Sequence, residues 1–221
     1  FASALMGEVS LAKPRELVGK ISRCVDALEK MFAELMDISR IDAGTVAVGR
    51  SSFALQGMFD RLEADFMPLA REKGLRLRIR PTREWTRSDP LMFERILRNL
   101  VANAIRYTER GGVLVACRRR GESAWIQVWD SGIGIAEKER ERIFEEFYQV
   151  GNPERDRSKG IGLGLSIVRR LADLLDEAVE LRSVPGRGSM FQLRTPRVPA
   201  ETPAAAAAAL PGVFEYAHLV V

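Results

Sequence analysis

The chain has little of the residue types that mark several kinds of site. It carries only two cysteines and one histidine in 221 residues. Cys24 and Cys117 fall in different predicted elements without metal-ligand spacing, and His218 has no second ligand beside it. The pattern therefore indicates neither a zinc site nor a disulfide framework. Such cysteine usage is typical of a protein in a reducing cytoplasm.

Long hydrophobic runs and charge of a single sign are also missing. The sequence has no signal peptide and no apolar run of the roughly 18 residues that a membrane helix needs, so we expect no membrane span in this chain. The net charge is +4, but most basic residues alternate with acidic ones, and the one tight cluster, 118–120, lies beside a predicted hairpin turn. Nucleic-acid binding is therefore not expected. With 46% hydrophobic residues, the chain can bury a core.

Residues 15–43 carry an apolar stripe of helical period. Its positions follow steps of four and three, namely Leu17, Ile21, Cys24, Leu28, Met31, Leu35 and Ile38. This heptad spacing favours packing against partner helices, and the neighbouring Val18, Val25 and Phe32 widen the stripe to the face expected in a bundle. We therefore predict that residues 1–46 form an antiparallel helical hairpin, which pairs with a second copy into a four-helix bundle. The alternative is a helix that packs onto its own domain.

Residues 50–195 predict a mixed α/β domain. Strands are expected at 51–55, 75–80, 112–120, 123–130, 178–184 and 189–194, and helices at 56–73, from Asp89 and Pro90 onward, at 136–148 and at 164–176. Because strands and helices do not alternate strictly, we predict an α+β two-layer sandwich with a mixed sheet and its helices on one face. Residues 196–221 have the proline- and alanine-rich composition of a linker, and the final "AHLVV" resembles the first strand of a further domain.

Two asparagines stand one turn apart in the helix that starts after Asp89. Asn99, Asn103 and Arg106 share one face of it, beside an apolar stripe formed by Phe93, Ile96, Leu97, Leu100 and Ala104. Asparagine is a poor helix former, so two asparagines one turn apart in a helix indicate a specific role for their side chains. An amide oxygen can bind Mg²⁺ and an arginine can contact phosphate, which would suit an anionic pocket. A solvated helix face is the alternative.

The strand at 123–130 ends in an aspartate on its apolar face. By strand alternation, Asp130 shares that face with Ile126 and Val128. A carboxylate there is unfavourable unless it accepts hydrogen bonds, and Gly132 and Gly134 would let a ligand approach the backbone beside it. The carboxylate can accept from the exocyclic amine of adenine, whereas the carbonyl of guanine would oppose it.

Three glycines, at 160, 162 and 164, run into an amphipathic helix. The N-terminus of such a helix presents free N–H groups that suit phosphate. The segment before the glycines is polar rather than a hydrophobic strand, and Lys159 precedes its glycine, so neither a Rossmann nor a Walker motif is indicated. We predict that the polar run 149–160 forms a lid.

Taken in order, five motifs resemble those of sensor histidine kinases. They are the asparagine stretch at 99–108, "DSGIG" at 130–134, "IFEEFYQV" at 143–150, "GIGLGL" at 160–165 and "GRGSMF" at 186–191. In addition, "LMDISRIDAG" at 35–44 resembles the end of that family's second dimerisation helix. The resemblance implies the Bergerat (GHKL) ATP-binding fold, with ATP and Mg²⁺ as cofactors. It also implies a homodimer formed through the hairpin and a response-regulator receiver domain as partner, fused after the linker in a hybrid kinase.

The resemblance implies a role for each candidate residue. Asn103 would bind Mg²⁺, Asp130 would hold the adenine amine and Tyr107 would stack on the ring. Asn99 would lie beside the reacting phosphate; an amide is no base, so it cannot activate water as the glutamate of related ATPases does. Candidates to neutralise the phosphates are Arg106, Arg155, Arg157 and Lys159. The complete candidate nucleotide site is Asn103, Arg106, Tyr107, Asp130, Gly132, Gly134, Lys159, Gly160, Gly162, Gly164, Leu165 and Ser189.

The implied function is transfer of the γ-phosphoryl group of ATP to a histidine and then to a response-regulator aspartate. The acceptor histidine is not in this chain and is expected upstream of Phe1; Gln149 stands where the family often has an arginine. The alternatives are a nucleotide-binding pseudokinase acting as a dimerising scaffold, and a gyrase-like ATPase, against which Asn99 argues. The expected location is the cytoplasm, or the cytoplasmic part of a membrane-bound sensor.

Overall fold

A computed structural model of the chain describes residues 18–200, apart from 151–161 and scattered positions between 19 and 37. By its internal contacts the chain divides into two units, Phe1–Val46 and Ala47–Val221. In the first unit the described residues are helical up to 42, and the turn that follows holds Gly44 in the left-handed conformation, with a φ of 65°. The predicted first helix of the hairpin and most of the predicted linker lie outside the described residues.

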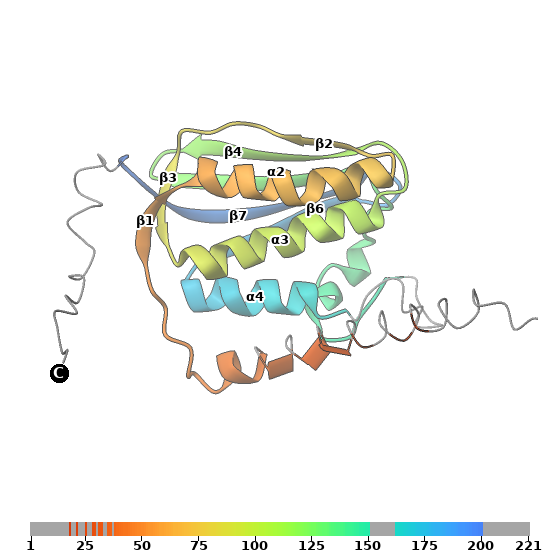
Figure 1. Cartoon of the computed structure of the whole chain (residues 1–221), viewed down its shortest axis with the longest axis horizontal. Helices are drawn as coiled ribbons and strands as arrows, with labels where there is room; N and C mark the ends of the chain where they lie inside the picture. Colours follow the sequence, from red (N-terminus) through yellow and green to blue (C-terminus); the bar gives the residue numbers. More distant parts are fainter. Residues whose placement is uncertain are drawn as a thin grey trace, which may run out of the picture. The chain divides into compact units, whose positions relative to one another are not determined.

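The second unit contains three long helices, which cover one face of a sheet (Figure 1). They are α2 (Leu55–Glu72), α3 (Pro90–Tyr107) and α4 (Gly164–Leu175), so the helices expected at these places are confirmed to within a residue or two. The start of α3 is fixed locally, since Oδ1 of Asp89 accepts from the N–H groups of Leu91 and Met92. In the part of the chain that the structure describes, no helix is long and apolar enough to cross a membrane.

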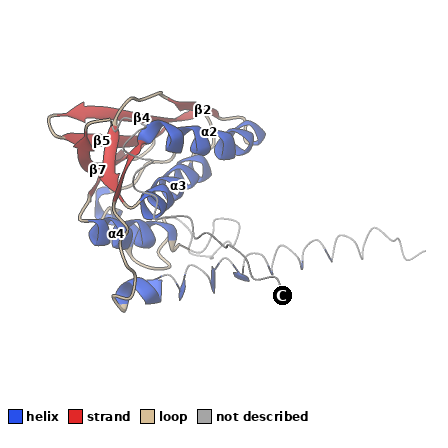
Figure 2. Cartoon of the chain, turned by 60° about the vertical axis from the view of Figure 1, so that its left-hand side comes forward, coloured by secondary structure: helices blue, strands red, loops and turns tan. Residues whose placement is uncertain are grey.

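Seven strands form one mixed sheet. They are β1 (Ser51–Ala54), β2 (Arg76–Ile79), β3 (Trp85–Ser88), β4 (Gly112–Arg120), β5 (Ser123–Asp130), β6 (Ala178–Val184) and β7 (Gly188–Val198). The order is β1-β3-β7-β5-β4-β2, with β6 also paired to β7. All pairs are antiparallel except β2 with β4. Figure 2 shows the helices gathered on one side of the strands, which confirms the predicted α+β two-layer sandwich.

The core lies between the sheet and the helices. The apolar stripe predicted for α3 is buried there, with Phe93, Ile96, Leu97 and Leu100 all 0% exposed. From the sheet, Ile126 and other inward residues of β5 meet them, and α2 and α4 contribute Phe59 and Ile167. Because the apolar stripe of α3 faces the sheet, its polar stripe is left at the edge of the layer.

One predicted helix is absent. Instead of a helix at 136–148, the chain forms two short 3₁₀ turns, η1 (Glu137–Glu139) and η2 (Arg142–Phe144). Glu145 is extended and Phe147 has a φ of 60°, which no helix accommodates. The N–H of Phe147 donates to the carbonyl of Gly162 at 3.1 Å. A tertiary hydrogen bond thus replaces the helical one that the local sequence favours.

The sheet is larger at one edge than the sequence predicted. β3 was not expected, and β7 runs on to Val198 rather than ending near 194. The two differences have one cause, because Trp85 pairs with Val198 and Thr86 with Arg197. Each segment is extended because it pairs with the other, and a short local sequence pattern does not reveal such long-range pairing.

Candidate functional site

A cavity lies between α3, the end of β5 and the segment that leads to residue 150. It is lined by Asn103, Ala104, Tyr107, Asp130, Ile133, Gly134, Ile135, Ile143, Tyr148, Gln149, Val150, Leu165, Ser189 and Phe191. Six predicted site residues are brought together there, namely Asn103, Tyr107, Asp130, Gly134, Leu165 and Ser189. Apolar walls with a few convergent polar groups are typical of sites for planar organic ligands.

Asp130 is held at the end of β5 by backbone N–H groups. Its Oδ1 accepts from the N–H of Gly132 at 2.8 Å and from that of Ser189 at 3.2 Å. Burial raises the pKa of the Asp130 carboxyl, and the hydrogen bonds from Gly132 and Ser189 act in the opposite direction. Both backbone donors are on Oδ1, so the carboxylate has a fixed orientation and Oδ2 accepts neither of them. A fixed acceptor in a partly buried place can distinguish a ligand donor from a ligand acceptor.

The two asparagines of α3 stand differently toward the cavity. Asn103 lines it, one turn before Tyr107. Asn99 donates from Nδ2 to the carbonyl of Arg95 at 2.9 Å, and its Oδ1 lies 3.0 Å from the point where a side chain at Gly164 would begin. The first turn of α4 therefore lies against the face of α3 that carries Asn99. Any residue larger than glycine at 164 would have to displace this amide.

The glycines after β5 have a role that the sequence did not suggest. A Cβ at Gly132 would lie 2.3 Å from the carbonyl oxygen of Tyr107, and one at Gly134 would lie 2.1 Å from that of Val184. Gly134 also has a φ of 68°, in the left-handed region. These glycines let the chain pass closely over α3 and β6, which positions Asp130 next to the end of α3. Of the two, only Gly134 lines the cavity.

The remaining predicted residues surround the cavity. Arg106 is exposed in the last turn of α3, and Gly164 is the first residue of α4. Gly162 has a φ of 84°, and its carbonyl accepts from the N–H of Phe147 at 3.1 Å, so a hydrogen bond joins the residues that flank the predicted lid. Outside the described residues lie Arg155, Arg157, Lys159 and Gly160.

Several cavity residues were not singled out as candidates from the sequence. The apolar ones are Ile133, Ile135, Ile143, Val150 and Phe191. Tyr148 also lines the cavity; the guanidinium of Arg142 lies 4.4 Å from its ring centre, and its hydroxyl donates to Glu139 at 3.3 Å. Three of the motifs contain some of these residues, but an isolated apolar residue in a loop has no pattern that separates a cavity wall from core.

Comparisons with known proteins agree with this geometry. A family model described as histidine kinase-, DNA gyrase B-, and HSP90-like ATPase matches residues 88–199. The sensor histidine kinase RcsC of Salmonella typhimurium is 31% identical over 209 residues, which cover 90% of this chain and 22% of RcsC. The virulence sensor protein BvgS of Bordetella bronchiseptica is 37% identical over 199 residues, covering 84% of this chain and 16% of BvgS. The chain thus spans about a fifth of the length of these relatives.

Solved structures show the same fold. Full-length ShkA in complex with AMPPNP matches with a TM-score of 0.73 and 28% identity, over 86% of this chain and 40% of ShkA. The catalytic domain of the histidine kinase ThkA matches with a TM-score of 0.58 over 67% of this chain and 96% of that one; at 24% identity this likeness concerns the fold alone. Family model, motif order and fold coincide. The chain therefore belongs to the family of histidine kinase-, DNA gyrase B- and HSP90-like ATPases, as an ATP-binding domain of the sensor histidine kinase type.

Proposed function

We propose that the cavity binds Mg²⁺-ATP. In this proposal the protein transfers the γ-phosphoryl group to a histidine on a helical hairpin and then to an aspartate of a receiver domain. The observation that carries the nucleotide assignment is Asp130, whose Oδ1 is fixed by two N–H groups in a cavity that also contains Tyr107. The carboxylate would accept from the adenine amine while the phenol ring of Tyr107 stacks on the base.

Asn103 is the residue that would bind the metal ion. Its amide oxygen is a hard ligand, and Mg²⁺ commonly takes only one or two protein ligands together with waters and phosphate oxygens. Within the described ranges there is no cluster of three or more His, Cys, Asp or Glu residues that could hold a metal, which fits a small protein ligand set. When bound, Mg²⁺ would neutralise charge on the phosphates.

Asn99 favours phosphoryl transfer over hydrolysis. An amide cannot take a proton from water, and the Nδ2 of Asn99 is already bonded to the Arg95 carbonyl. The attacking group therefore has to come from elsewhere, and an imidazole on the helical hairpin meets that need. The gyrase-like alternative requires a base at this position, so the transferase is the better fit.

The helix of the first unit supports a homodimer as the working form. Val18, Leu28 and Phe32, which belong to its predicted stripe, are each 64% exposed. Ile21 and Val25, which lie between them along the helix, are 55% and 46% exposed, and a run of exposed apolar residues of this size marks an interaction site. A second copy of the same helix would cover them, and the cytoplasm, which supplies ATP and receiver domains, is the proposed location.

Substitution of Asp130 tests the nucleotide assignment. Asp130→Asn replaces part of the acceptor surface with a donor that faces the adenine amine, and the affinity for ATP should fall by roughly ten- to a hundredfold. Titration calorimetry on the whole chain measures it, with Asp173→Asn, an exposed site on α4, as the matched control. Unchanged ATP affinity, or GTP bound as tightly as ATP by the parent, would remove Asp130 from the site.

The transfer step needs its own measurement. A form of the protein that includes the histidine-bearing helix should acquire acid-labile, base-stable phosphate from γ-labelled ATP, and Asn103→Asp should suppress the labelling. If that form binds ATP normally but stays unlabelled, the kinase assignment is wrong and the dimerising scaffold takes its place.

A further inference from the structure

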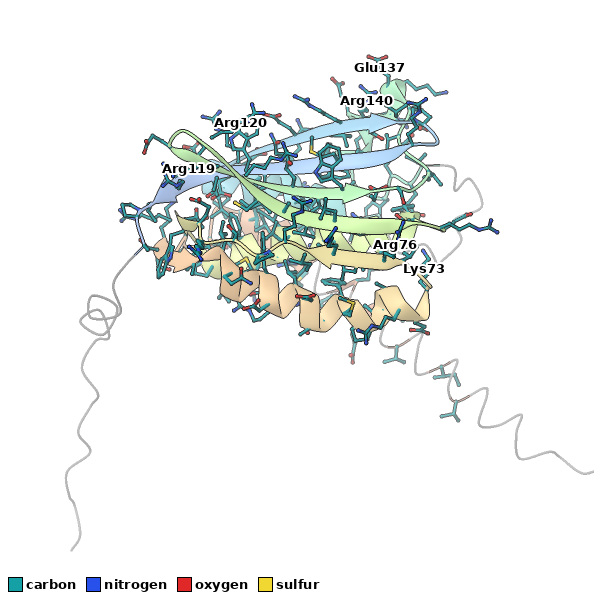
Figure 3. All side chains as sticks on the ribbon, turned by 90° about the horizontal axis from the view of Figure 1, so that it is seen from above. Lys73, Arg76, Arg119, Arg120, Glu137 and Arg140 are labelled. Carbon is teal, nitrogen blue, oxygen red and sulfur yellow. The ribbon has the colours of Figure 1, made fainter. Side chains whose placement is uncertain are left out.

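The sheet has a second face that the described helices leave uncovered. Ile126 and Val128 of β5 point toward the helices, so by strand alternation Trp125, Gln127 and Trp129 point the other way. The strands β2, β4, β5, β7 and β6 lie side by side in this region. Figure 3 looks onto this side of the molecule. The nucleotide assignment uses none of these three outward side chains.

Arginines dominate the uncovered face. Six of them occupy outward strand positions, which together we name the basic face: Arg76, Arg78, Arg118, Arg120, Arg182 and Arg194. All six are exposed, and among the described residues none forms an ion pair. Glu180 is the one acidic residue at an outward position of these five strands, and it accepts from Gln192 at 3.2 Å. The basic face therefore carries a concentrated and unneutralised positive charge.

The floor between the arginines is rigid. Nε1 of Trp129 donates to Gln127 at 3.3 Å, and Nε2 of Gln127 donates to Gln192 at 2.6 Å, so the amides satisfy one another across the strands. Gln127 and Gln192 are 6% and 2% exposed. The guanidinium of Arg120 lies 4.4 Å from the ring centre of Trp125. Such a floor loses little conformational freedom when a partner docks on it.

A hollow opens at one end of this face. It measures about 840 Å³. Its lining includes Leu114, Trp129, Arg76 and Arg78 from the strands, Met67 and Arg71 from α2, and Asp130 at the end of β5. Trp129 is 40% exposed in it. The hollow thus offers an apolar contact with Trp129 beside three arginines and the single carboxylate of Asp130, and this excess of positive charge suits an apolar side chain flanked by carboxylates.

We propose that the basic face is a docking surface for an acidic protein surface, which places an apolar side chain in the hollow beside Trp129. The basic face carries arginines and tryptophans and no lysine at its outward strand positions. Arginine and tryptophan are enriched at the energetic centres of protein interfaces, whereas lysine is depleted in interfaces. Arginine also binds carboxylates through two parallel hydrogen bonds. The five strands have four to eleven residues each. With a rise of ~3.3 Å per residue and a spacing of ~4.8 Å they give roughly 600 Å², about three quarters of the ~800 Å² that one partner contributes to a stable interface.

Two other partners fit this face less well. For a nucleic acid, the amides of Gln127 and Gln192 are bonded to each other rather than free to contact bases. For a membrane, apolar groups would have to project from the surface, whereas Trp129 lines a hollow. The acidic protein surface agrees with both the charge and the shape.

Peptide binding to the whole chain tests the proposal. The probe is a fluorescent peptide in which glutamates surround a central leucine, followed by anisotropy. It should bind, and Arg78→Glu combined with Arg194→Glu should weaken binding at least tenfold. Replacing the leucine of the peptide by serine should weaken binding to the parent and have no further effect in Trp129→Ala, because the apolar contact with the indole is then already missing. The matched control is Arg83→Glu with Lys138→Glu, two exposed sites outside these strands.

Several results would overturn the proposal. The first is that the glutamate peptide does not bind. The second is an equal loss of peptide affinity in the control pair, which would indicate an effect of bulk charge only. The third is tighter binding of an oligonucleotide or of anionic vesicles through the same arginines. ATP affinity should be the same in all these variants, since none of the changed residues was placed at the nucleotide. Failure of the docking proposal therefore leaves the nucleotide assignment intact, and failure of the nucleotide assignment leaves the docking proposal intact.

Discussion

Two helices of this chain carry apolar stripes of comparable regularity in opposite environments. In α3, Phe93, Leu97 and Leu100 are 0% exposed. In the helix of the first unit, Val18, Leu28 and Phe32 are each 64% exposed. The stripe of α3 is covered by the sheet of its own domain. In the first unit the stripe is exposed at Leu28 and buried at its end, where Ile38 is 6% exposed; in the proposed dimer a second copy covers the exposed part. A periodic stripe thus predicts a helix and its buried face, but not which surface covers that face.

The contrast separates a self-sufficient domain from an element that depends on association. Full burial of a large apolar side chain contributes roughly 1.5–3 kcal/mol. The α/β domain gains this from its own chain, so its stability should not depend on protein concentration. In the proposed dimer the first-unit helix gains apolar contacts from a second molecule, so its association should depend on concentration.

Breaking the helical stripe should have the largest effect. Leu28→Asp together with Leu35→Asp places two charges in the proposed interface and should convert dimers to monomers, while ATP affinity stays nearly unchanged. Light scattering gives the mass, and Arg40→Asp, at an exposed site outside the stripe, is the control. Persistence of the dimer would mean that another surface associates or that the helix packs within its own chain.

Truncation of a buried side chain in α3 should lower the stability of the α/β domain and leave the association of the first-unit helix unchanged. Leu97 is fully buried, so Leu97→Ala should lower the free energy of unfolding of the α/β domain by about 2–5 kcal/mol through lost contacts and a residual cavity. Urea denaturation followed by tryptophan fluorescence measures the change. The oligomeric state should not change, and a dimer lost together with stability would show that the two units do not fold independently.

The stability of the α/β domain should depend on pH through Glu177. Burial raises the pKa of Glu177 from 4.5 to about 7, against the hydrogen bond that Thr195 donates at 2.9 Å. The folded state therefore holds a proton that the unfolded state releases, so stability is greatest below about pH 4.5 for this group and falls until about pH 7. The whole change is about 3 kcal/mol.

Glu177→Gln should abolish that pH dependence, because the amide does not ionise. The variant should then exceed the parent in stability at pH 8, as measured by urea denaturation at several pH values. Parallel stability profiles of parent and variant between pH 5 and pH 8 would show that Glu177 is ionised throughout.

Removal of the cap of α3 should have the smallest effect. The Asp89 carboxylate accepts from the N–H groups of Leu91, Met92 and Gly49. Asp89→Ala should cost about 1 kcal/mol of stability, and Asp89→Ser should restore most of it, since a hydroxyl can also cap a helix. A loss well above that of Leu97→Ala would mean that the bond to Gly49 matters more than the cap.

Elements whose signals are local lie where the sequence predicts them. The Asp89-Pro90 start of α3 and the Gly-Glu turn between β4 and β5 depend on neighbours in the chain, and both elements lie where they were expected. The sequence did not predict β3, and the helix that it predicts at 136–148 is absent. Trp85 is in a strand because it pairs with Val198, and Phe147 leaves the helical conformation as it bonds to Gly162. These partners are remote in sequence.

For the candidate site, the sequence by itself determined which side chains are present and which share a face. Helical spacing put Asn103 and Tyr107 on one face of α3, and strand alternation put Asp130 at the inner end of β5. The tertiary structure alone decided their neighbours: Gly132 lies against the Tyr107 carbonyl, and Gly164 against Asn99. Periodicity along a chain determines the face of a helix or strand to which each side chain points. Contact between elements is determined by long-range packing and pairing, which no local pattern encodes.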